Sequence, residues 1–130
     1  MSTGMNKNTK VKTVRLVTEI GSDADWNTKE TRQLVAGILE LKTTDEAKRF
    51  LRDLLTPAEI TEFSKRLEAA RLLSRDVQYE AISESTGLSS TTIARIAKWL
   101  YGSLGGYRLI LSRLHRSNSS PQRKGLRLSS

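Results

Sequence analysis

Apolar residues recur every three or four positions through most of the chain, a spacing that places them on one face of an α-helix. A first helix is predicted from about residue 29 to residue 41, with apolar positions Leu34, Val35, Ile38, Leu39 and Leu41. A second helix is predicted to follow Thr44 as its N-cap, because Asp45 and Glu46 come next and suit the positive end of a helix dipole. No alternating stretch within residues 26–115 is long enough for a sheet, so the predicted fold is all-α.

The clearest helix start is the sequence Thr56-Pro57-Ala58-Glu59. Thr56 can cap the helix, and Pro57 occupies the first turn, where no amide donor is needed. Glu59 can complete a capping box with Thr56. The helix that begins here is predicted to run to Ser74, with a stripe of apolar residues along one side.

Residues 78–101 are predicted to form two short helices joined by a tight turn. Gly87 follows the first helix, where it permits the left-handed conformation that a sharp turn needs. Ser83 is small enough for a close helix approach, and Ile93 and Ile96 can fix the second helix onto the first. This spacing is typical of a DNA-binding helix-turn-helix, although an ordinary helical hairpin whose hydroxyls only cap a helix has the same local features.

The second helix of this pair is expected to be capped by Ser89 or Ser90 and to expose hydroxyl and basic side chains. Hydroxyls can contact base edges or phosphates, and arginine can reach guanine or the backbone. A glycine-rich turn at residues 102–106 follows, and the arginine just after it is also placed for a phosphate. The predicted DNA-binding residues are Ser89, Ser90, Thr91, Thr92, Arg95, Lys98 and Arg108.

The distribution of charge strengthens this interpretation. The chain has 130 residues and a formal net charge of +8, and all 14 acidic residues lie between Glu19 and Glu84. The remaining C-terminal part carries only basic charges, a one-sided field that favours a polyanion such as double-stranded DNA. Basic ends that only keep the protein soluble are the simpler alternative.

Composition divides the chain into three parts. We expect a flexible or arm-like segment at residues 1–25, a helical DNA-binding domain at residues 26–116 and a disordered basic tail at residues 117–130. No apolar run approaches the roughly 18 residues of a membrane span, and we expect no secretory signal because no apolar region follows the first lysines. The absence of cysteine agrees with the cytoplasm. The single histidine, His115, has no clustered ligands, so we expect no metal, no cofactor and no enzymatic activity.

Residues 51–114 resemble the tryptophan repressor superfamily, and within it the YerC/YecD-like group of repressor-like proteins. The matching motifs are Leu54-Leu55-Thr56-Pro57-x-Glu59, Arg66, Gly87-Leu-Ser-Ser-Thr-Thr-Ile-Ala-Arg95 and Gly105-Gly106-Tyr107-Arg108-Leu109. The resemblance implies an intertwined, all-helical bacterial-type homodimer that places two recognition helices on a palindromic operator. The helix that contains Thr91 and Arg95 would then read the DNA.

The same resemblance raises the question of a ligand. Thr56, Arg66 and Arg95 match positions that hold tryptophan in the repressor, which implies a ligand site at these residues. Ile96 and Trp99 stand where the repressor has glycine and serine beside the indole, and their added volume is expected to fill the slot. We therefore expect that tryptophan does not bind, and that Arg66 forms ion pairs or Arg95 contacts phosphate instead.

Taken together, these features predict a sequence-specific transcriptional regulator, most simply a repressor. Two other functions are also compatible with the sequence. The helical hairpin could be a module that binds another protein, or the basic ends could bind nucleic acid without sequence preference.

Overall fold

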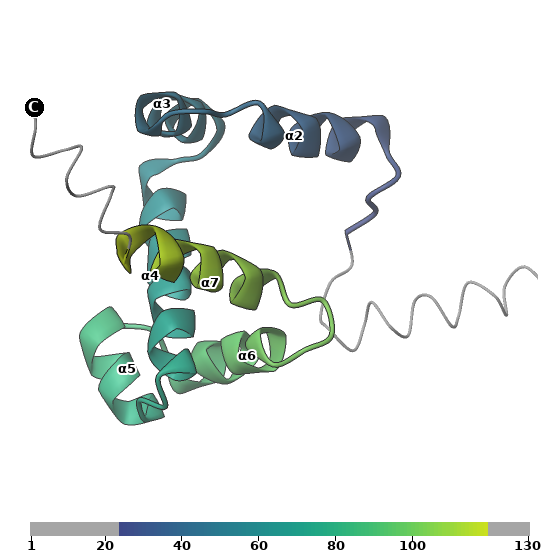
Figure 1. Cartoon of the computed structure of the whole chain (residues 1–130). Helices are drawn as coiled ribbons and strands as arrows, with labels where there is room; N and C mark the ends of the chain where they lie inside the picture. Colours follow the sequence, from purple (N-terminus) through teal and green to yellow (C-terminus); the bar gives the residue numbers. More distant parts are fainter. Residues whose placement is uncertain (1–23, 120–130) are drawn as a thin grey trace, which may run out of the picture. The chain divides into compact units, whose positions relative to one another are not determined.

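The computed structural model describes residues 24–119, and Figure 1 shows that this part of the chain is built from helices. The helices are α2 (Lys29–Leu39), α3 (Thr44–Leu54), α4 (Pro57–Ser74), α5 (Tyr79–Thr86), α6 (Ser90–Leu100) and α7 (Gly106–Ser119). No strand occurs within residues 24–119, which confirms the all-α prediction. The chain divides into two compact units, and the division falls inside α4, between Ser64 and Lys65.

The first unit contains α2 and α3, and a threonine caps each of them. Thr28 Oγ1 accepts a hydrogen bond from the amide of Thr31 at 3.0 Å. Thr43 caps α3 in the same way, so the prediction of Thr44 as the cap is wrong by one residue. Thr43 has the extended backbone that a cap requires, with φ −131° and ψ 162°, whereas Thr44 is already helical.

The start of α4 confirms the predicted capping box. Glu59 Oε1 accepts a hydrogen bond from the Thr56 amide at 2.9 Å, and Thr56 Oγ1 accepts one from the Glu59 amide at 3.1 Å. The helix ends at Ser74 as predicted. Asp76 then adopts a left-handed conformation with φ 62°, and the amide of Val77 donates to the carbonyl of Leu72 at 3.1 Å, which closes the end of α4.

The second unit has its buried core where α4, α5 and α6 pack together. Ala69 and Ala70 on α4 are fully buried, and their small side chains allow the neighbouring helices to come close. The other buried apolar residues are Leu73, Ile82, Leu88, Ile93, Ile96 and Leu100. Tyr107 and Leu111 of α7 pack against this core, so the helix pair α5–α6 is supported from two sides.

The helix α7 continues to Ser119, three residues into the segment predicted to be a disordered tail. Residues 1–23 of the predicted arm and residues 120–130 of the tail lie outside the described residues. Among the helices of residues 24–119, none is long and apolar enough to cross a membrane.

Candidate nucleic-acid interface

The turn between α5 and α6 has the geometry that the sequence predicts. Helix α5 ends at Thr86, and Gly87 follows in the left-handed conformation with φ 80°. The amide of Gly87 donates to the carbonyl of Ser83 at 2.8 Å. A residue with a side chain rarely adopts this backbone conformation, so glycine is needed here to redirect the chain.

Two hydroxyl groups hold the turn together. Ser83 Oγ donates to the carbonyl of Leu88 at 2.8 Å, which ties α5 to the chain entering α6. Thr86 Oγ1 donates to the carbonyl of Ile82 at 2.7 Å and accepts from the Leu88 amide at 3.2 Å. Thr86 is buried, and its role was not predicted, although a threonine directly before the turn glycine is a usable signal in the sequence.

The N-cap of α6 is Ser89, one of the two serines predicted for this role. Its Oγ accepts a hydrogen bond from the Thr92 amide and donates one to Thr92 Oγ1, both at 3.1 Å. The Ser89 hydroxyl therefore both donates and accepts within the cap, and the Thr92 hydroxyl accepts one hydrogen bond there. Ser90 and Thr91 are exposed, and no acidic residue lies in the first turn of α6.

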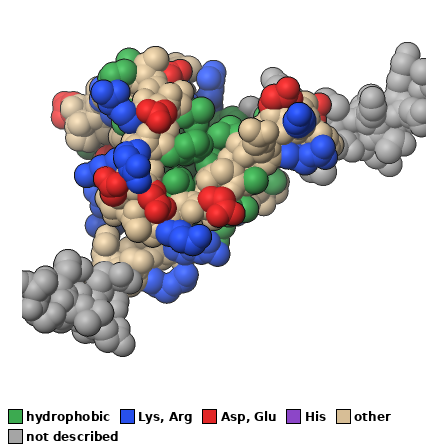
Figure 2. Space-filling model, turned by 90° about the horizontal axis from the view of Figure 1, so that it is seen from above, with side chains coloured by type: hydrophobic (Ala, Val, Ile, Leu, Met, Phe, Trp, Pro, Cys, Tyr) green, Lys and Arg blue, Asp and Glu red, His purple; other side chains and the backbone are tan. Residues whose placement is uncertain are grey.

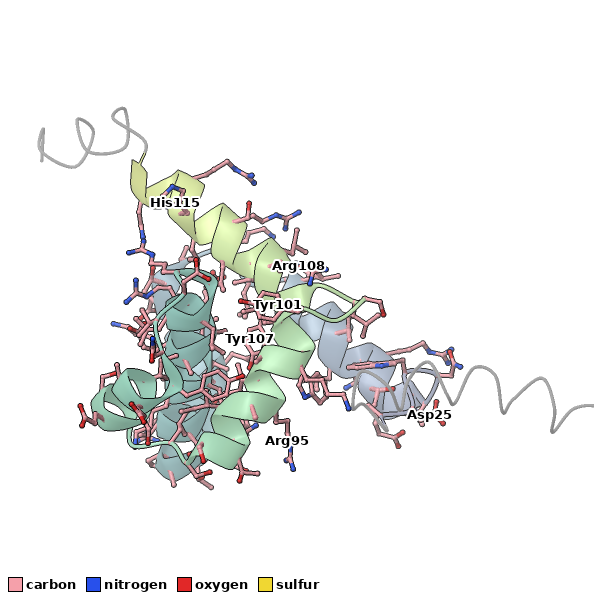
Figure 3. All side chains as sticks on the ribbon, turned by 90° about the horizontal axis from the view of Figure 1, so that it is seen from below. Asp25, Arg95, Tyr101, Tyr107, Arg108 and His115 are labelled. Atoms are coloured by element: carbon pink, nitrogen blue, oxygen red, sulfur yellow. The ribbon has the colours of Figure 1, made fainter. Side chains whose placement is uncertain are left out.

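Helix α6 has one buried face and one exposed face. Ile93, Ile96 and Leu100 are buried, with Ile93 fully so, which confirms that this face anchors α6 on the core. The exposed residues include Ser90, Thr91, Ala94, Arg95 and Lys98. Figure 3 shows the Arg95 side chain extending away from the core. The structure therefore brings together the hydroxyls and the cations predicted for DNA binding on α6.

Arg108 lies elsewhere, at the C-terminal end of α6 (Figure 3). Its Nη1 donates to the carbonyl of Gly102 at 2.9 Å and also to the carbonyl of Leu100. The guanidinium packs so closely on Gly105 that a Cβ there would lie 2.8 Å from Nη2. Since α6 has 11 residues, a helix rise of about 1.5 Å per residue separates this site from Ser90 by roughly 15 Å.

Two residues of the implied ligand site, Arg66 and Arg95, line the same hollow. A hollow of about 250 Å³ is lined by Arg66, Thr92, Arg95, Ile96, Trp99 and Tyr107. Ile96 is 3% exposed and belongs to the core, and Trp99 is half-buried, so both side chains form walls of this hollow. Thr56 belongs to the first unit, where its hydroxyl is part of the capping box of α4.

Tyr107 is a partly buried tyrosine in the lining of this hollow. Burial raises the pKa of the Tyr107 hydroxyl above its usual value, although the positive charge of Arg66 acts in the opposite direction. The phenol is therefore neutral at physiological pH and offers a hydrogen-bond donor between α4 and α6. Across residues 24–119 no group of three or more metal-ligating side chains could hold a metal ion.

Comparison with known proteins identifies the family of this chain. The model of the Trp repressor protein family matches residues 29–115. The uncharacterized protein YerC of Bacillus subtilis (strain 168) is 36% identical over 96 residues, which cover 74% of this chain and 92% of YerC. The crystal structure of a TrpR like protein from Eubacterium eligens ATCC 27750 is similar with a TM-score of 0.65 and 40% sequence identity, and the match covers 69% of this chain and 93% of that one. The chain therefore belongs to the Trp repressor protein family.

Proposed function

We propose that this protein is a transcriptional regulator that binds double-stranded DNA by inserting α6 into the major groove. The observation that carries the proposal is the division of α6 into a face fixed by Ile93 and Ile96 and an exposed face with Thr91 and Arg95. Family membership and the TrpR-like fold support the same function. Occupation of an operator by such a protein would most simply repress transcription.

The exposed residues of α6 divide into two proposed roles. Ser90 and Thr91 at the first turn contact base edges, directly or through water. Arg95 and Lys98 contact phosphates or guanine. Ser89 and Thr92 act indirectly, because their hydroxyls form the cap that orients the helix. Arg108 stays a predicted phosphate contact, although its guanidinium already binds carbonyl groups of the chain.

We also propose that the regulator is a homodimer. Neither α2 nor α3 contains a single buried residue, although both carry large apolar side chains. The large exposed apolar residues on these two helices are Leu34, Val35, Ile38, Leu39, Leu51 and Leu54. Uncovered hydrophobic side chains are visible at the surface in Figure 2. Burial of this much apolar surface favours association, and a second copy of the chain is the proposed partner.

Sedimentation measurements test whether the protein is a dimer in solution. A stable monomer at micromolar concentration would contradict it. A dimer would present two copies of α6, so the DNA sites selected from a random pool should be palindromic. Their half-sites should be spaced about one helical turn of DNA, or a multiple of it, apart.

The proposed regulator acts in the cytoplasm and without tryptophan. The hollow beside Arg66 and Arg95 measures about 250 Å³. Ile96 and Trp99 restrict it on the side of α6. We therefore propose that DNA binding is not controlled by this amino acid.

A gel-shift titration against genomic DNA fragments tests the DNA-binding function. We expect specific complexes whose affinity falls steeply with salt, and a Thr91→Ala variant should bind its best site about 5- to 100-fold more weakly, as expected for a lost base contact. Thr44→Ala is the matched control, because Thr44 is an exposed threonine in the first turn of α3.

Three outcomes would contradict the proposal. The absence of any complex at low salt would exclude DNA binding. An unchanged DNA affinity of Thr91→Ala and Arg95→Ala, together with loss of a protein complex, would favour a protein-interaction module. Loss of all DNA binding on removal of residues 1–22 and 120–130 would favour non-specific binding by the basic ends.

A further inference from the structure

We propose that Lys65, on α4, is an additional phosphate-binding residue of the DNA interface, placed beside the turn of the helix-turn-helix. The inference rests on the proposed function and adds a contact from outside the α5–α6 pair. Its basis is a close approach: Lys65 Nζ lies 3.8 Å from the position that a Cβ on Gly87 would take. The two residues are 22 positions apart in the sequence.

The packing of α4 explains why the lysine reaches this turn. Lys65 and Ala69 are four residues apart, so they lie on the same face of the helix. Ala69 is fully buried in the core that α4 shares with α5 and α6. Lys65 is exposed one turn earlier, where this face leaves the core and meets the turn at Gly87.

The ammonium group of Lys65 is available for a phosphate. Glu68, the carboxylate three residues further along α4, is held by Arg71 through hydrogen bonds of 2.8 Å and 2.6 Å. Within residues 24–119 Lys65 itself forms no ion pair. A solvated lysine with three donors and no carboxylate partner can exchange its water for phosphate oxygens and release a counterion from DNA.

The position of Lys65 complements the cations of α6. Lys98 lies in the last turn of α6, whereas Lys65 lies beside Gly87, two residues before the N-cap Ser89. Cations therefore stand near both ends of the proposed reading helix. A helix in the major groove runs between two phosphate backbones, so charges at both of its ends can fix its depth and orientation without reading sequence.

The test compares Lys65→Met with Arg75→Met in the full-length protein. Both substitutions remove one exposed positive charge from the α4 region, but Arg75 lies ten residues after Lys65, just past the C-terminal end of α4. Affinity for one selected site is measured by fluorescence anisotropy between about 50 and 200 mM salt. Thermal unfolding followed by circular dichroism checks that each variant is folded.

We expect Lys65→Met to lower the slope of log affinity against log salt by about 0.9 for each Lys65 that contacts DNA, and Arg75→Met to leave it unchanged. A slope difference of this size corresponds to about a 3.5-fold smaller loss of affinity over that salt range. The weakening should be the same on specific and unrelated duplexes, because a phosphate contact carries no sequence information. Lys65→Arg should keep the wild-type slope.

Several results would overturn the inference. A Lys65→Met protein with the wild-type affinity and slope would show that the lysine does not touch DNA, while the proposed function would stand. An effect on the specific site alone would also contradict a phosphate contact. Equal losses for Lys65→Met and Arg75→Met would indicate a general charge effect. A wild-type protein that binds no duplex would overturn this inference together with the proposed function.

Discussion

The hydroxyl of Ser83 donates a 2.8 Å hydrogen bond to the carbonyl of Leu88, across the turn that joins α5 to α6. Leu88 is buried, so this bond connects a residue of α5 to a fixed point just before α6 begins. The angle between the two helices depends on this connection and on the conformation of Gly87 between them. The turn therefore constrains how α6 leaves α5, and the burial of Ile93 and Ile96 fixes α6 on the core.

Replacement of Ser83 by alanine should lower the free energy of unfolding by about 1 kcal/mol, because the carbonyl of Leu88 loses its side-chain partner. Chemical denaturation measures the effect. Ser85→Ala is the matched control, since Ser85 donates a longer 3.3 Å bond to the carbonyl of Ile82 within α5 and should change stability by less than about 0.5 kcal/mol. Equal effects of the two substitutions would contradict the special role of Ser83.

Replacement of Gly87 by alanine should destabilise the protein by about 1–2 kcal/mol, because an L-residue is strained at φ 80°. The added Cβ would lie 3.8 Å from Lys65 Nζ, an ordinary contact, so the cost comes from the backbone and not from a clash. Gly106→Ala is the control: its Cβ would meet no atom within 4 Å, and its φ is not positive. That variant should be as stable as the wild type or up to about 1 kcal/mol more stable. Thermal unfolding measures both effects, and equal stabilities of Gly87→Ala and Gly106→Ala would contradict the prediction.

Replacement of Arg108 by methionine should cost about 1.5 kcal/mol of stability, because the carbonyls of Leu100 and Gly102 lose a charged donor. An Arg108→Lys variant should recover little of this lost stability, since lysine lacks the planar guanidinium with its several donors. The salt dependence of DNA binding separates this structural role from a phosphate contact. A slope lowered by about 0.9 for each Arg108 would support the contact, and an unchanged slope would leave only the structural role. Wild-type stability of the methionine variant would contradict a stabilising role for the bonds from Arg108 to these two carbonyls.

Tryptophan should neither bind to this protein nor change its DNA affinity. The walls formed by Ile96 and Trp99 narrow the hollow in which an indole would need to lie. Calorimetric titration at millimolar tryptophan should give no binding heat, and gel shifts with and without tryptophan should coincide. Trp99→Ser provides the comparison, because it removes a half-buried wall and leaves the buried Ile96 in the core. Saturable binding to the wild type would refute the prediction.

Local features were predicted well because their hydrogen bonds close within a few residues. The capping box of Thr56 and Glu59 and the left-handed turn at Gly87 both follow from residues that are neighbours in the chain. The predicted N-cap of α3 was wrong by one residue because Thr43 and Thr44 are adjacent, and the side chain of either could cap the helix. The extension of α7 to Ser119 was missed because polar residues that suggest disorder can also continue an established helix.

The charge pattern, the helix-turn-helix and the family resemblance were thus determined by the sequence itself. Only the tertiary structure placed Lys65 beside Gly87 and turned Arg108 back onto the end of α6. It also directed Ile96 into the core and left a hollow beside it. Each of these arrangements depends on how one helix packs against another. Packing is set by the shape of the whole core, and no short stretch of sequence contains that information.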